Sequence, residues 1–410
     1  MDMAKPKIRF KGYQEDWEQR KLDDIATSFE YGLNAAAKEF DGVNKYIRIT
    51  DIDDDSHLFM VDNLTSPDID LSDANNYKLS VGDILFARTG ASVGKTYIYR
   101  DSDGLVYYAG FLIRAKISEE NNAEFVFQNT LTEKYYKYIA ITSQRSGQPG
   151  VNAQEYAGYE IFVPCRAEQD KISEYLGCLD KLITLHQRKC DQTKKLKKFM
   201  LQKMFPQNGK KVPELRFSEF TDDWEQRKLG EYAEIVGGGT PSTKVSAYWD
   251  GDINWYAPAE ILDQIYLSSS QRKITEQGLN RSSAKMLPVG TVLFTSRAGI
   301  GKTAILSHVA CTNQGFQSIV PHDGKLDSYF IYSRTDELKK YAETVGAGST
   351  FVEVSGKQMS NMELMMPKTI KEQQVIGNYF RKIDNLITLH QRKYEELQKV
   401  KKFMLQNMFV

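Results

Sequence analysis

Two long stretches of the chain carry apolar residues at every third or fourth position. In the first, the apolar stripe runs through Ile172, Leu176, Leu179, Ile183 and His186, and in the second it runs through Ile376, Phe380, Ile383, Ile387 and His390. An average step of about 3.5 residues is the period of a coiled coil. We therefore predict two long helices, over residues 167–205 and 370–410, whose apolar seams pair with each other.

The segments before each helix have another pattern. Short runs of alternating apolar and polar residues, such as 44–53 and 111–117, are bounded by Gly, Asn, Asp and Ser and predict β-strands. Residues 124–143 and 328–345 have helical spacing instead. The sequence therefore predicts an α+β fold with two tandem mixed α/β domains, each followed by a long helix, over residues 1–166 and 214–369 with a linker at 206–213.

The chain is one unit written twice. PKIRFKGYQEDWEQRKL at residues 6–22 returns as PELRFSEFTDDWEQRKL at 213–229, and DKLITLHQRK at 180–189 returns as DNLITLHQRK at 384–393. The residues between these anchors are largely unrelated, so two copies share a frame and present different surfaces. This favours two different targets held by one frame, although duplicated domains also drift without a change of function. A pseudo-twofold relation between the copies would make the helix pair antiparallel.

Cysteine use and the N-terminus bear on the compartment. Cys165, Cys178, Cys190 and Cys311 form no CxxC pair and have no neighbouring histidine pair, so we expect reduced structural thiols and no metal site. The N-terminus lacks the apolar segment of a signal peptide, and no apolar run approaches the length of a membrane span. We expect a cytoplasmic protein without a membrane partner.

Several segments, in an order that occurs twice, resemble a known family. They are WEQRKLGEYAEIVGGGTPS (224–242), DINWYAPAEI (252–261), LFTSRAGIGKT (293–303), TNQGFQSIVP (312–321) and the proline-to-EQ entries of both long helices at 164–169 and 367–373. This arrangement resembles the specificity subunit of type I restriction-modification systems. The resemblance implies that each mixed domain is a target recognition domain, reading one half of a bipartite, asymmetric DNA sequence.

The resemblance also implies the partners. Besides double-stranded DNA, these are two methyltransferase (modification) subunits and the restriction/translocase subunits, which would carry S-adenosylmethionine, ATP and magnesium and perform adenine methylation or restriction. This chain has no Pro-Pro dipeptide and hence no Pro-Pro-aromatic signature of an amino-methyltransferase, so we expect no catalytic site and no cofactor in it. A helix of about 35 residues spans about 50 Å, more than the roughly 34 Å of one DNA turn, so the helix pair would act as a ruler between half-sites.

Charge is unevenly distributed along the chain. Lys+Arg and Asp+Glu both number 54, but residues 23–164 hold 12 basic against 22 acidic residues, and residues 230–367 hold 12 against 14. By contrast, residues 180–203 hold eight basic residues against two acidic ones, and residues 384–407 hold five against three. Because phosphate neutralisation supplies much of protein–DNA affinity, we predict that the isolated chain binds DNA weakly. Partner subunits would then supply most of the contacts that hold the DNA backbone.

The segments GASVGKT (90–96) and GIGKT (299–303) are similar to a phosphate-binding loop, but Thr89 and Ser296 stand where its first glycine belongs. A strand-turn that brings basic side chains to DNA, or a structural glycine turn, fits these residues better. Polar loops add side chains able to pair with adenine or guanine edges. The candidate DNA-binding residues are Arg88, Thr89, Ser92, Lys95, Ser143, Arg145, Ser146, Gln148, Asn152, Thr240, Ser242, Ser296, Arg297, Lys302, Asn313, Gln314, Gln317, Ser349 and Thr350.

Two other functions remain open from the sequence. A duplicated coiled-coil assembly scaffold with protein-binding variable domains would use its acidic surfaces on basic partners. An NTPase would need nucleotide binding, which the broken loop spacing disfavours. His186 and His390 occupy equivalent seam positions, where packing or register selection is favoured over a shared metal.

Overall fold

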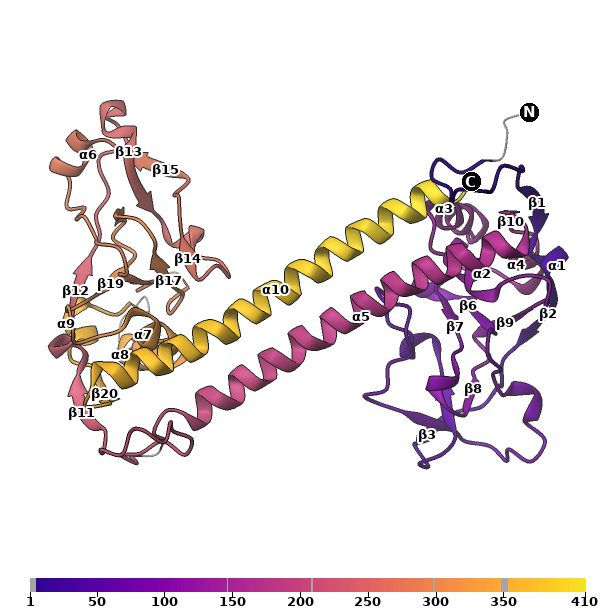
Figure 1. Cartoon of the computed structure of the whole chain (residues 1–410), viewed down its shortest axis with the longest axis horizontal. Helices are drawn as coiled ribbons and strands as arrows, with labels where there is room; N and C mark the ends of the chain where they lie inside the picture. The colour runs from indigo at the N-terminus through magenta and orange to yellow at the C-terminus, as the bar shows by residue number, and fades with distance from the viewer. Residues whose placement is uncertain (1–4, 146, 208, 298, 348–352) are drawn as a thin grey trace. The chain divides into compact units, whose positions relative to one another are not determined.

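The computed structural model describes residues 5–145, 147–207, 209–297, 299–347 and 353–410. The chain divides into two compact units (Figure 1): unit 1 comprises residues 1–188 and 390–410, and unit 2 comprises residues 189–389. Each unit holds one mixed domain together with parts of both long helices, α5 (Arg166–Lys203) and α10 (Ile370–Met408).

Unit 1 is built on an antiparallel four-stranded sheet with the order β2-β9-β6-β7. Strands β1 and β10 pair separately, as do β3 with β5 and β4 with β8. The strands are β1 (Glu18–Lys21), β2 (Ala26–Tyr31), β3 (Ala37–Glu39), β4 (Lys45–Ile47), β5 (Thr65–Pro67), β6 (Ile84–Ala87), β7 (Thr96–Ile98), β8 (Val106–Tyr108), β9 (Leu112–Ile117) and β10 (Glu160–Val163). The short helices are α1 (Leu22–Ile25), α2 (Ala123–Asn129), α3 (Glu133–Thr142) and α4 (Ala153–Ala157).

Unit 2 repeats this plan with a five-stranded sheet in the order β12-β19-β16-β17-β14, a three-stranded sheet β15-β13-β18 and the pair β11-β20. Its strands are β11 (Glu225–Lys228), β12 (Ala233–Gly237), β13 (Trp249–Tyr256), β14 (Tyr266–Leu267), β15 (Arg272–Ile274), β16 (Val292–Phe294), β17 (Thr303–Leu306), β18 (Ala310–Thr312), β19 (Gln317–Pro321) and β20 (Glu363–Met366). Its short helices are α6 (Glu276–Asn280), α7 (Ser328–Ser333), α8 (Thr335–Gly346) and α9 (Gly356–Ser360).

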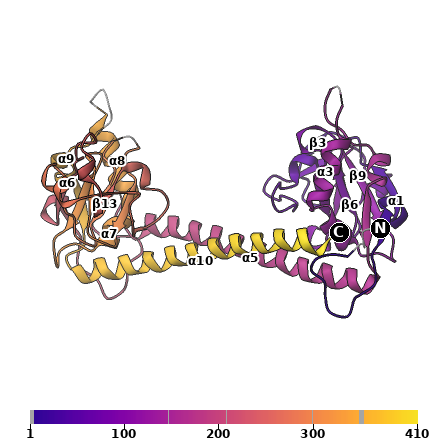
Figure 2. The same cartoon turned by 90° about the horizontal axis from the view of Figure 1, so that it is seen from above.

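The inner strands β6 and β16 of the two central sheets are buried on both faces. In β6, Ile84 and Phe86 join the core that includes α2 and α3, whereas Leu85 and Ala87 join a second core with β4 and β8. Figure 2 shows β6, β9 and α3 within unit 1. In a strand, successive side chains point to opposite faces, so a run of apolar residues is what a doubly covered strand requires. In unit 2, Val292 and Phe294 of β16 face one core and Leu293 faces the other.

The two segments with helical spacing are helical, but each forms two helices. In unit 1 the break falls between α2 and α3, where the Thr132 hydroxyl accepts a hydrogen bond from the Tyr135 N–H as the N-cap of α3. In unit 2 the break falls at Arg334, whose guanidinium donates to the Met365 carbonyl at 2.7 Å. Both segments are thus helical as their spacing predicts, and capping and a tertiary contact divide each of them into two helices.

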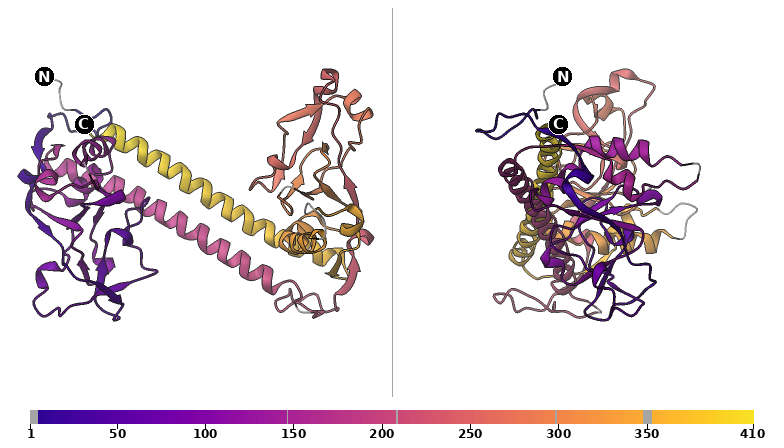
Figure 3. Two further views of the ribbon diagram at one scale, coloured as in Figure 1. Left: turned by 180° about the vertical axis from the view of Figure 1, so that it is seen from behind. Right: turned by 90° about the vertical axis from the view of Figure 1, so that its right-hand side faces the viewer.

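Each unit completes its core with the end of a long helix from the other copy. In unit 1, Leu405, Met408 and Phe409 pack with Trp17 and Phe125. Figure 3 shows the C-terminal end of α10 beside this domain. In unit 2, the corresponding end of α5 brings Met204 and Phe205 against a core with residues that include Trp224, Phe330 and Phe380.

Within each unit, segments of α5 and α10 run antiparallel. In unit 1, Lys401 Nζ lies 2.6 Å from Asp180 Oδ1, and the Nδ1 atoms of His186 and His390 are 3.0 Å apart. In unit 2, Lys197 Nζ lies 2.7 Å from Asp384 Oδ1. The two ion pairs are equivalent under the repeat, because an offset of 204 residues relates Asp180 to Asp384 and Lys197 to Lys401. The predicted fold class of two mixed α/β domains, each followed by a long helix, is confirmed, whereas a regular knobs-into-holes coiled coil stays a prediction.

None of the helices in the described ranges is long and apolar enough to cross a membrane.

Candidate nucleic-acid interface

In unit 1, several loops meet at the end of β6. The Arg88 N–H donates to the Phe111 carbonyl at 3.1 Å, and the Arg88 carbonyl accepts from the Val151 N–H at 2.9 Å. Next to them, the Gly90 N–H donates to the Pro149 carbonyl at 3.0 Å. These bonds hold together residues 31–34, 88–92, 109–111 and 148–153, which we call the first loop surface.

Unit 2 repeats this backbone arrangement. The Ser296 N–H donates to the Gly315 carbonyl at 2.8 Å, and the Ser296 carbonyl accepts from the Val354 N–H at 3.1 Å. We call residues 237–242, 296–297, 313–317 and 353–356 the second loop surface. Ser296 is therefore the counterpart of Arg88, and Gly315 is the counterpart of Phe111.

A close backbone crossing fixes both surfaces. A Cβ on Gly32 would lie 2.2 Å from the Ala109 carbonyl oxygen, and a Cβ on Gly238 would lie 2.0 Å from the Asn313 carbonyl oxygen. Only glycine permits such an approach. In each unit the residue after this glycine forms a backbone hydrogen bond of 2.8 Å. The Leu33 N–H donates to the Tyr108 carbonyl, and the Gly239 N–H donates to the Thr312 carbonyl.

The side chains on this shared frame differ. The first loop surface exposes Tyr31 and Phe111, with 44% and 61% of their surface accessible. The second has Gly237 and Gly315 at the matching positions, and the side chain of Ser296 is buried where Arg88 stands in unit 1. Thus one backbone frame presents two chemically different surfaces.

Of the residues predicted in unit 1, Arg88, Thr89, Ser92, Gln148 and Asn152 belong to the first loop surface, and several of the predicted residues have local structural roles. Asn152 caps α4, accepting from the Glu155 N–H at 2.9 Å, and Arg145 pairs with the Glu155 carboxylate. Ser143 is a buried C-cap of α3. The other predicted residues at this surface are exposed or half-buried: Arg88, Thr89, Ser92 and Gln148.

The lysines of the GKT segments are held by backbone carbonyls. Lys95 Nζ donates to the Ile52 carbonyl at 3.0 Å and pairs with Asp54, and Lys302 Nζ donates to the Ile261 carbonyl at 3.2 Å. The next residue in each segment is a threonine whose hydroxyl forms a hydrogen bond with a threonine hydroxyl at the end of a helix. Thr96 and Thr130, at the C-cap of α2, are 2.8 Å apart, and Thr303 and Thr335, at the start of α8, are 2.6 Å apart. The GKT segments are thus hairpin turns docked on helices, and DNA contact by Lys95 and Lys302 stays a prediction.

In unit 2, the predicted residues on loops 238–242 and 313–317 contact each other. The Thr240 hydroxyl donates to Gln314 Oε1 at 2.5 Å, and Asn313 Oδ1 accepts from the Gly315 N–H at 2.8 Å. The Ser242 carbonyl accepts from Trp249 Nε1 at 3.1 Å. Arg297 and Gln317 are half-buried beside them, and the Ser296 hydroxyl has no partner among the described residues. Ser146, Ser349 and Thr350 lie outside the described residues.

The sequence reasoning missed Tyr31, Phe111 and Arg272. The Arg88 guanidinium lies over the Tyr31 ring, 5.0 Å from its centroid, and the Arg272 guanidinium lies over the Trp249 ring at 3.6 Å. Each stack joins residues far apart in the sequence, so no local motif marks them. Trp249 Nε1 donates to Ser242, which brings Arg272 to the second loop surface.

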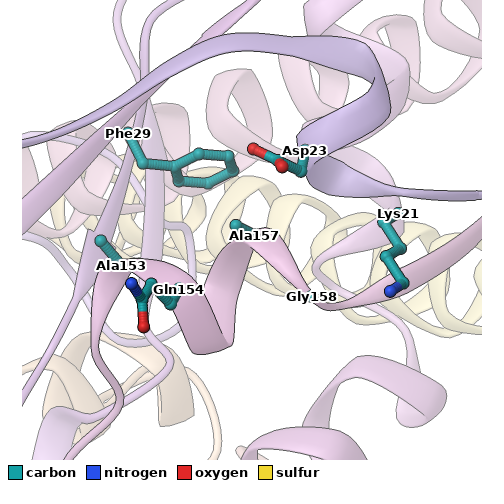
Figure 4. A pocket seen from close by; sticks show the side chains of 7 residues that line it. All are labelled: Lys21, Asp23, Phe29, Ala153, Gln154, Ala157 and Gly158. Carbon is teal, nitrogen blue, oxygen red and sulfur yellow. The ribbon is translucent and has the colours of Figure 1, made fainter.

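A hollow of about 460 Å³ borders the first loop surface (Figure 4). It lies between β1, α1, β2 and α4, and the ring of Phe29 and the carboxylate of Asp23 face each other across it. The hollow adjoins the loops because the Ala153 N–H donates to the Tyr31 hydroxyl at 3.3 Å. Its lining residues are Lys21, Asp23, Phe29, Ala153, Gln154, Ala157 and Gly158.

His186 and His390 of unit 1 lie together at the seam, where the sequence left a shared metal open. Only two imidazoles meet there, and the part of the chain that the structure describes holds no group of three or more His, Cys, Asp or Glu side chains that could hold a metal ion.

Comparison with known proteins matches both copies. Residues 14–195 and 221–399 match the family model of the type I restriction modification DNA specificity domain. The type I restriction enzyme MjaIX specificity subunit of Methanocaldococcus jannaschii is 37% identical over 191 residues, which cover 46% of this chain and 44% of that relative. The putative MjaX specificity subunit of the same organism is 25% identical over 401 residues, 95% of this chain and 91% of the relative.

A solved structure supports the same fold. The S subunit of a type I restriction-modification system from M. genitalium aligns over 99% of both chains with a TM-score of 0.67 and 13% identity.

Proposed function

Because the chain belongs to the type I restriction modification DNA specificity family, we propose that it selects a bipartite, asymmetric DNA target, one half-site through each loop surface. The resemblance found in the sequence is confirmed by this membership. The family recognises DNA targets, and the division of the target between units 1 and 2 is our proposal. The observation that carries it is the shared backbone frame with different side chains at Arg88 and Ser296, and at Phe111 and Gly315.

We propose that partner subunits carry the chemistry. Adenine methylation and restriction would take place on methyltransferase and restriction/translocase subunits, which bind S-adenosylmethionine, ATP and magnesium. This chain would contribute target selection without a catalytic site or a cofactor of its own. It would work inside the cytoplasm, where those subunits and the DNA meet.

Two equivalent apolar sets on the long helices support two methyltransferase subunits per chain. Unit 1 exposes Leu182 and Leu185 of α5 and Val400 and Phe403 of α10, with accessible fractions of 37%, 43%, 39% and 53%. Unit 2 exposes the repeat-related set, Leu386, Leu389, Leu196 and Phe199, with fractions of 48%, 50%, 46% and 49%. Exposed large apolar side chains on a helix are suited to protein docking. One partner on each set matches the duplication.

The long helices would also set the spacing between half-sites. α5 has 38 residues and α10 has 39. At about 1.5 Å per residue, each spans more than one turn of DNA. A continuous helix resists bending, so a fixed spacer between the two half-sites is expected.

The test is genome-wide mapping of methylated adenines in cells that express the chain with a cognate methyltransferase subunit. A bipartite motif that disappears when the chain is omitted supports the proposal. Absence of chain-dependent methylation, in a complex shown to assemble with an active methyltransferase subunit, would favour the protein-binding scaffold instead.

The control exchanges residues 23–163 for the same segment of a related subunit that methylates a different motif. One half of the motif should change and the other should stay the same.

A further inference from the structure

Several arginines of this chain stack on aromatic rings, and most of them also hold a carboxylate. Arg100 lies over Phe127 and pairs with Glu124, Arg114 lies over Tyr108 and pairs with Glu30, and Arg334 lies over Phe330 and pairs with Glu337. In these three cases a carboxylate of the fold pairs with the guanidinium. Their roles are structural.

Arg88 and Arg272 are different. Each guanidinium lies over an aromatic ring, yet within the described ranges neither forms an ion pair or a side-chain hydrogen bond. In the domain of unit 1, every other described arginine up to residue 163 has a carboxylate partner: Arg9, Arg20, Arg48, Arg100, Arg114 and Arg145. An unpaired arginine stands out in a segment with 22 acidic residues against 12 basic ones.

The backbone around Arg88 is fixed on both sides. Its N–H donates to Phe111 and its carbonyl accepts from Val151, while its guanidinium rests on Tyr31, a side chain that is 44% exposed. The side chain is therefore held over the first loop surface by a ring and a rigid strand end, which reduces the entropy lost when the guanidinium binds a ligand.

Arg272 is held by equally rigid groups in unit 2. It pairs with Trp255 across β13 and β15, its carbonyl accepts from the Ser270 hydroxyl at 2.6 Å, and its guanidinium covers Trp249. Both tryptophans anchor the second loop surface, because Trp255 Nε1 donates to the Gly239 carbonyl at 2.8 Å and Trp249 Nε1 donates to the Ser242 carbonyl. The exposed Arg272 guanidinium therefore lies beside the second loop surface.

We propose that Arg88 and Arg272 are specificity-determining residues, each donating a bidentate pair of hydrogen bonds to O6 and N7 of one guanine, one in each half-site. A planar guanidinium matches the two acceptors at the guanine edge in the major groove. A ring beneath the guanidinium fixes its plane without using its N–H donors, which a carboxylate would occupy. This inference rests on the proposed function, since it names the base that each loop surface reads.

A phosphate contact is the competing use of such a group. A lysine keeps the positive charge that a phosphate contact needs, but its ammonium lacks the planar pair of donors that an arginine fits to O6 and N7 of one guanine. Replacement by lysine therefore separates the two uses: phosphate binding largely survives it, and guanine discrimination is weakened.

The first experiment maps methylation in cells expressing Arg88→Lys or Arg272→Lys chains with the same methyltransferase subunit. Each variant should accept other bases at one guanine position of one half-site, with the other half-site unchanged, and the two variants should affect opposite halves. The matched controls are Arg100→Lys, which is stacked and ion-paired, and Arg227→Lys, which pairs with Glu225. Both controls should keep the wild-type motif.

The second experiment measures binding of the assembled complex to target DNA in which each guanine in turn is replaced by 7-deazaguanine, which lacks the N7 acceptor. One substitution per half-site should weaken wild-type binding by roughly 5- to 150-fold. The same substitution should cause no further loss with the lysine variant of the matching unit. Combining the DNA substitutions with the lysine variants tests the contact even where a variant methylates too poorly for mapping.

The proposal is overturned if both lysine variants keep the wild-type motif, or if every 7-deazaguanine effect persists unchanged in them. Either result leaves the proposed function standing, because the wild-type motif still depends on the chain. Absence of any chain-dependent motif in the wild type would instead remove the proposed function itself.

Discussion

Two buried carboxylates, Glu168 and Glu372, join the entry segment of each copy to the start of its long helix. Glu372 receives two hydrogen bonds from Arg216, at 2.7 and 2.9 Å, and one from Trp224 Nε1 at 3.1 Å. The hydrogen bond from Arg216 to Glu372, more than their charge attraction, raises the pKa of the guanidinium. Glu168 holds Arg9 in the same way.

Glu372→Gln should destabilise unit 2, because it removes one charge of a buried pair and leaves the other without compensation. The expected loss is about 3 kcal/mol, or roughly 150-fold in the opening equilibrium, measured by hydrogen exchange in unit 2. Glu225→Gln, in the exposed pair with Arg227, is the control and should leave exchange unchanged. Equal protection in the two variants would contradict this account of Glu372.

The cysteines should differ sharply in reactivity. Cys165 and Cys178 are exposed, whereas Cys190 and Cys311 are buried. Burial raises the pKa of Cys311 to about 11, so the reactive thiolate is scarce at pH 8. Iodoacetamide at pH 8 should therefore alkylate Cys165 and Cys178 in the native chain and reach the other two only after denaturation. Rapid native labelling of Cys311, detected by peptide mass spectrometry, would contradict its placement.

For single residues, the sequence indicated which loops form the candidate DNA interface better than it indicated what each side chain contacts. It placed candidate contacts around Arg88 and Ser296, and the structure brings those loops together in each unit. It also proposed Lys95 and Lys302 as DNA contacts, although their ammonium groups are bonded to carbonyls more than forty residues away. Arg272 could not be predicted as a candidate, because the proposal for it rests on the Trp249 ring beneath its guanidinium and on the lack of an ion pair within the described ranges, both of which are set by tertiary structure.

Among the elements, the long helices are held by repeat-related ion pairs. In unit 1, Asp180 pairs with Lys401 and also accepts from Gln128 Nε2 at 2.7 Å. In unit 2, Asp384 pairs with Lys197 and accepts from the Tyr329 hydroxyl at 2.9 Å. Each carboxylate thus links its own helix both to the antiparallel helix and to a helix of the mixed domain.

Asp180→Lys should destabilise unit 1 by about 2 kcal/mol, because it places two ammonium groups together and removes a charged hydrogen bond. Adding Lys401→Asp should restore part of this loss by reversing the pair, although Gln128 loses its acceptor. Hydrogen exchange of α2 and of the end of α10 is the measurement. A double variant no more protected than Asp180→Lys alone would show that the pair does not hold the helices.

The long helices were predictable because their seam repeats over many turns. The breaks between α2 and α3, and between α7 and α8, were not, because the apolar spacing continues through both. What ends the first helix in unit 1 is the cap at Thr132, and in unit 2 the reach of Arg334 to the Met365 carbonyl. The spacing of apolar residues indicates which face of a helix is buried, whereas a break between two helices depends on a few hydrogen bonds.

For the whole molecule, the equal numbers of basic and acidic residues limit what the chain does alone. With 54 of each, few phosphates can be neutralised without an opposing carboxylate nearby. The isolated chain should bind its target with a Kd no tighter than about 10⁻⁶ M at physiological salt, with tight binding only in the assembled complex. Fluorescence anisotropy titrations measure both. Nanomolar binding by the chain alone would contradict the prediction that partner subunits supply most of the contacts to DNA.

The duplication makes a further prediction about target symmetry. Replacing residues 230–366 with residues 23–163 would give a chain with the first loop surface at both positions, on frames that the Gly32 and Gly238 crossings already share. The pseudo-twofold relation that the duplication predicts would give such a chain the symmetry of a twofold dimer, whose DNA target is palindromic.

The modified motif should then become an inverted repeat of the first half-site. The reciprocal chain, with the two segments exchanged, should keep both half-sites and reverse their order. Methylation mapping distinguishes these outcomes, with copurification of the methyltransferase subunit as the check on assembly. An assembled, active complex of the doubled chain that still modifies the original asymmetric sequence would show that base selection lies outside the two exchanged domains.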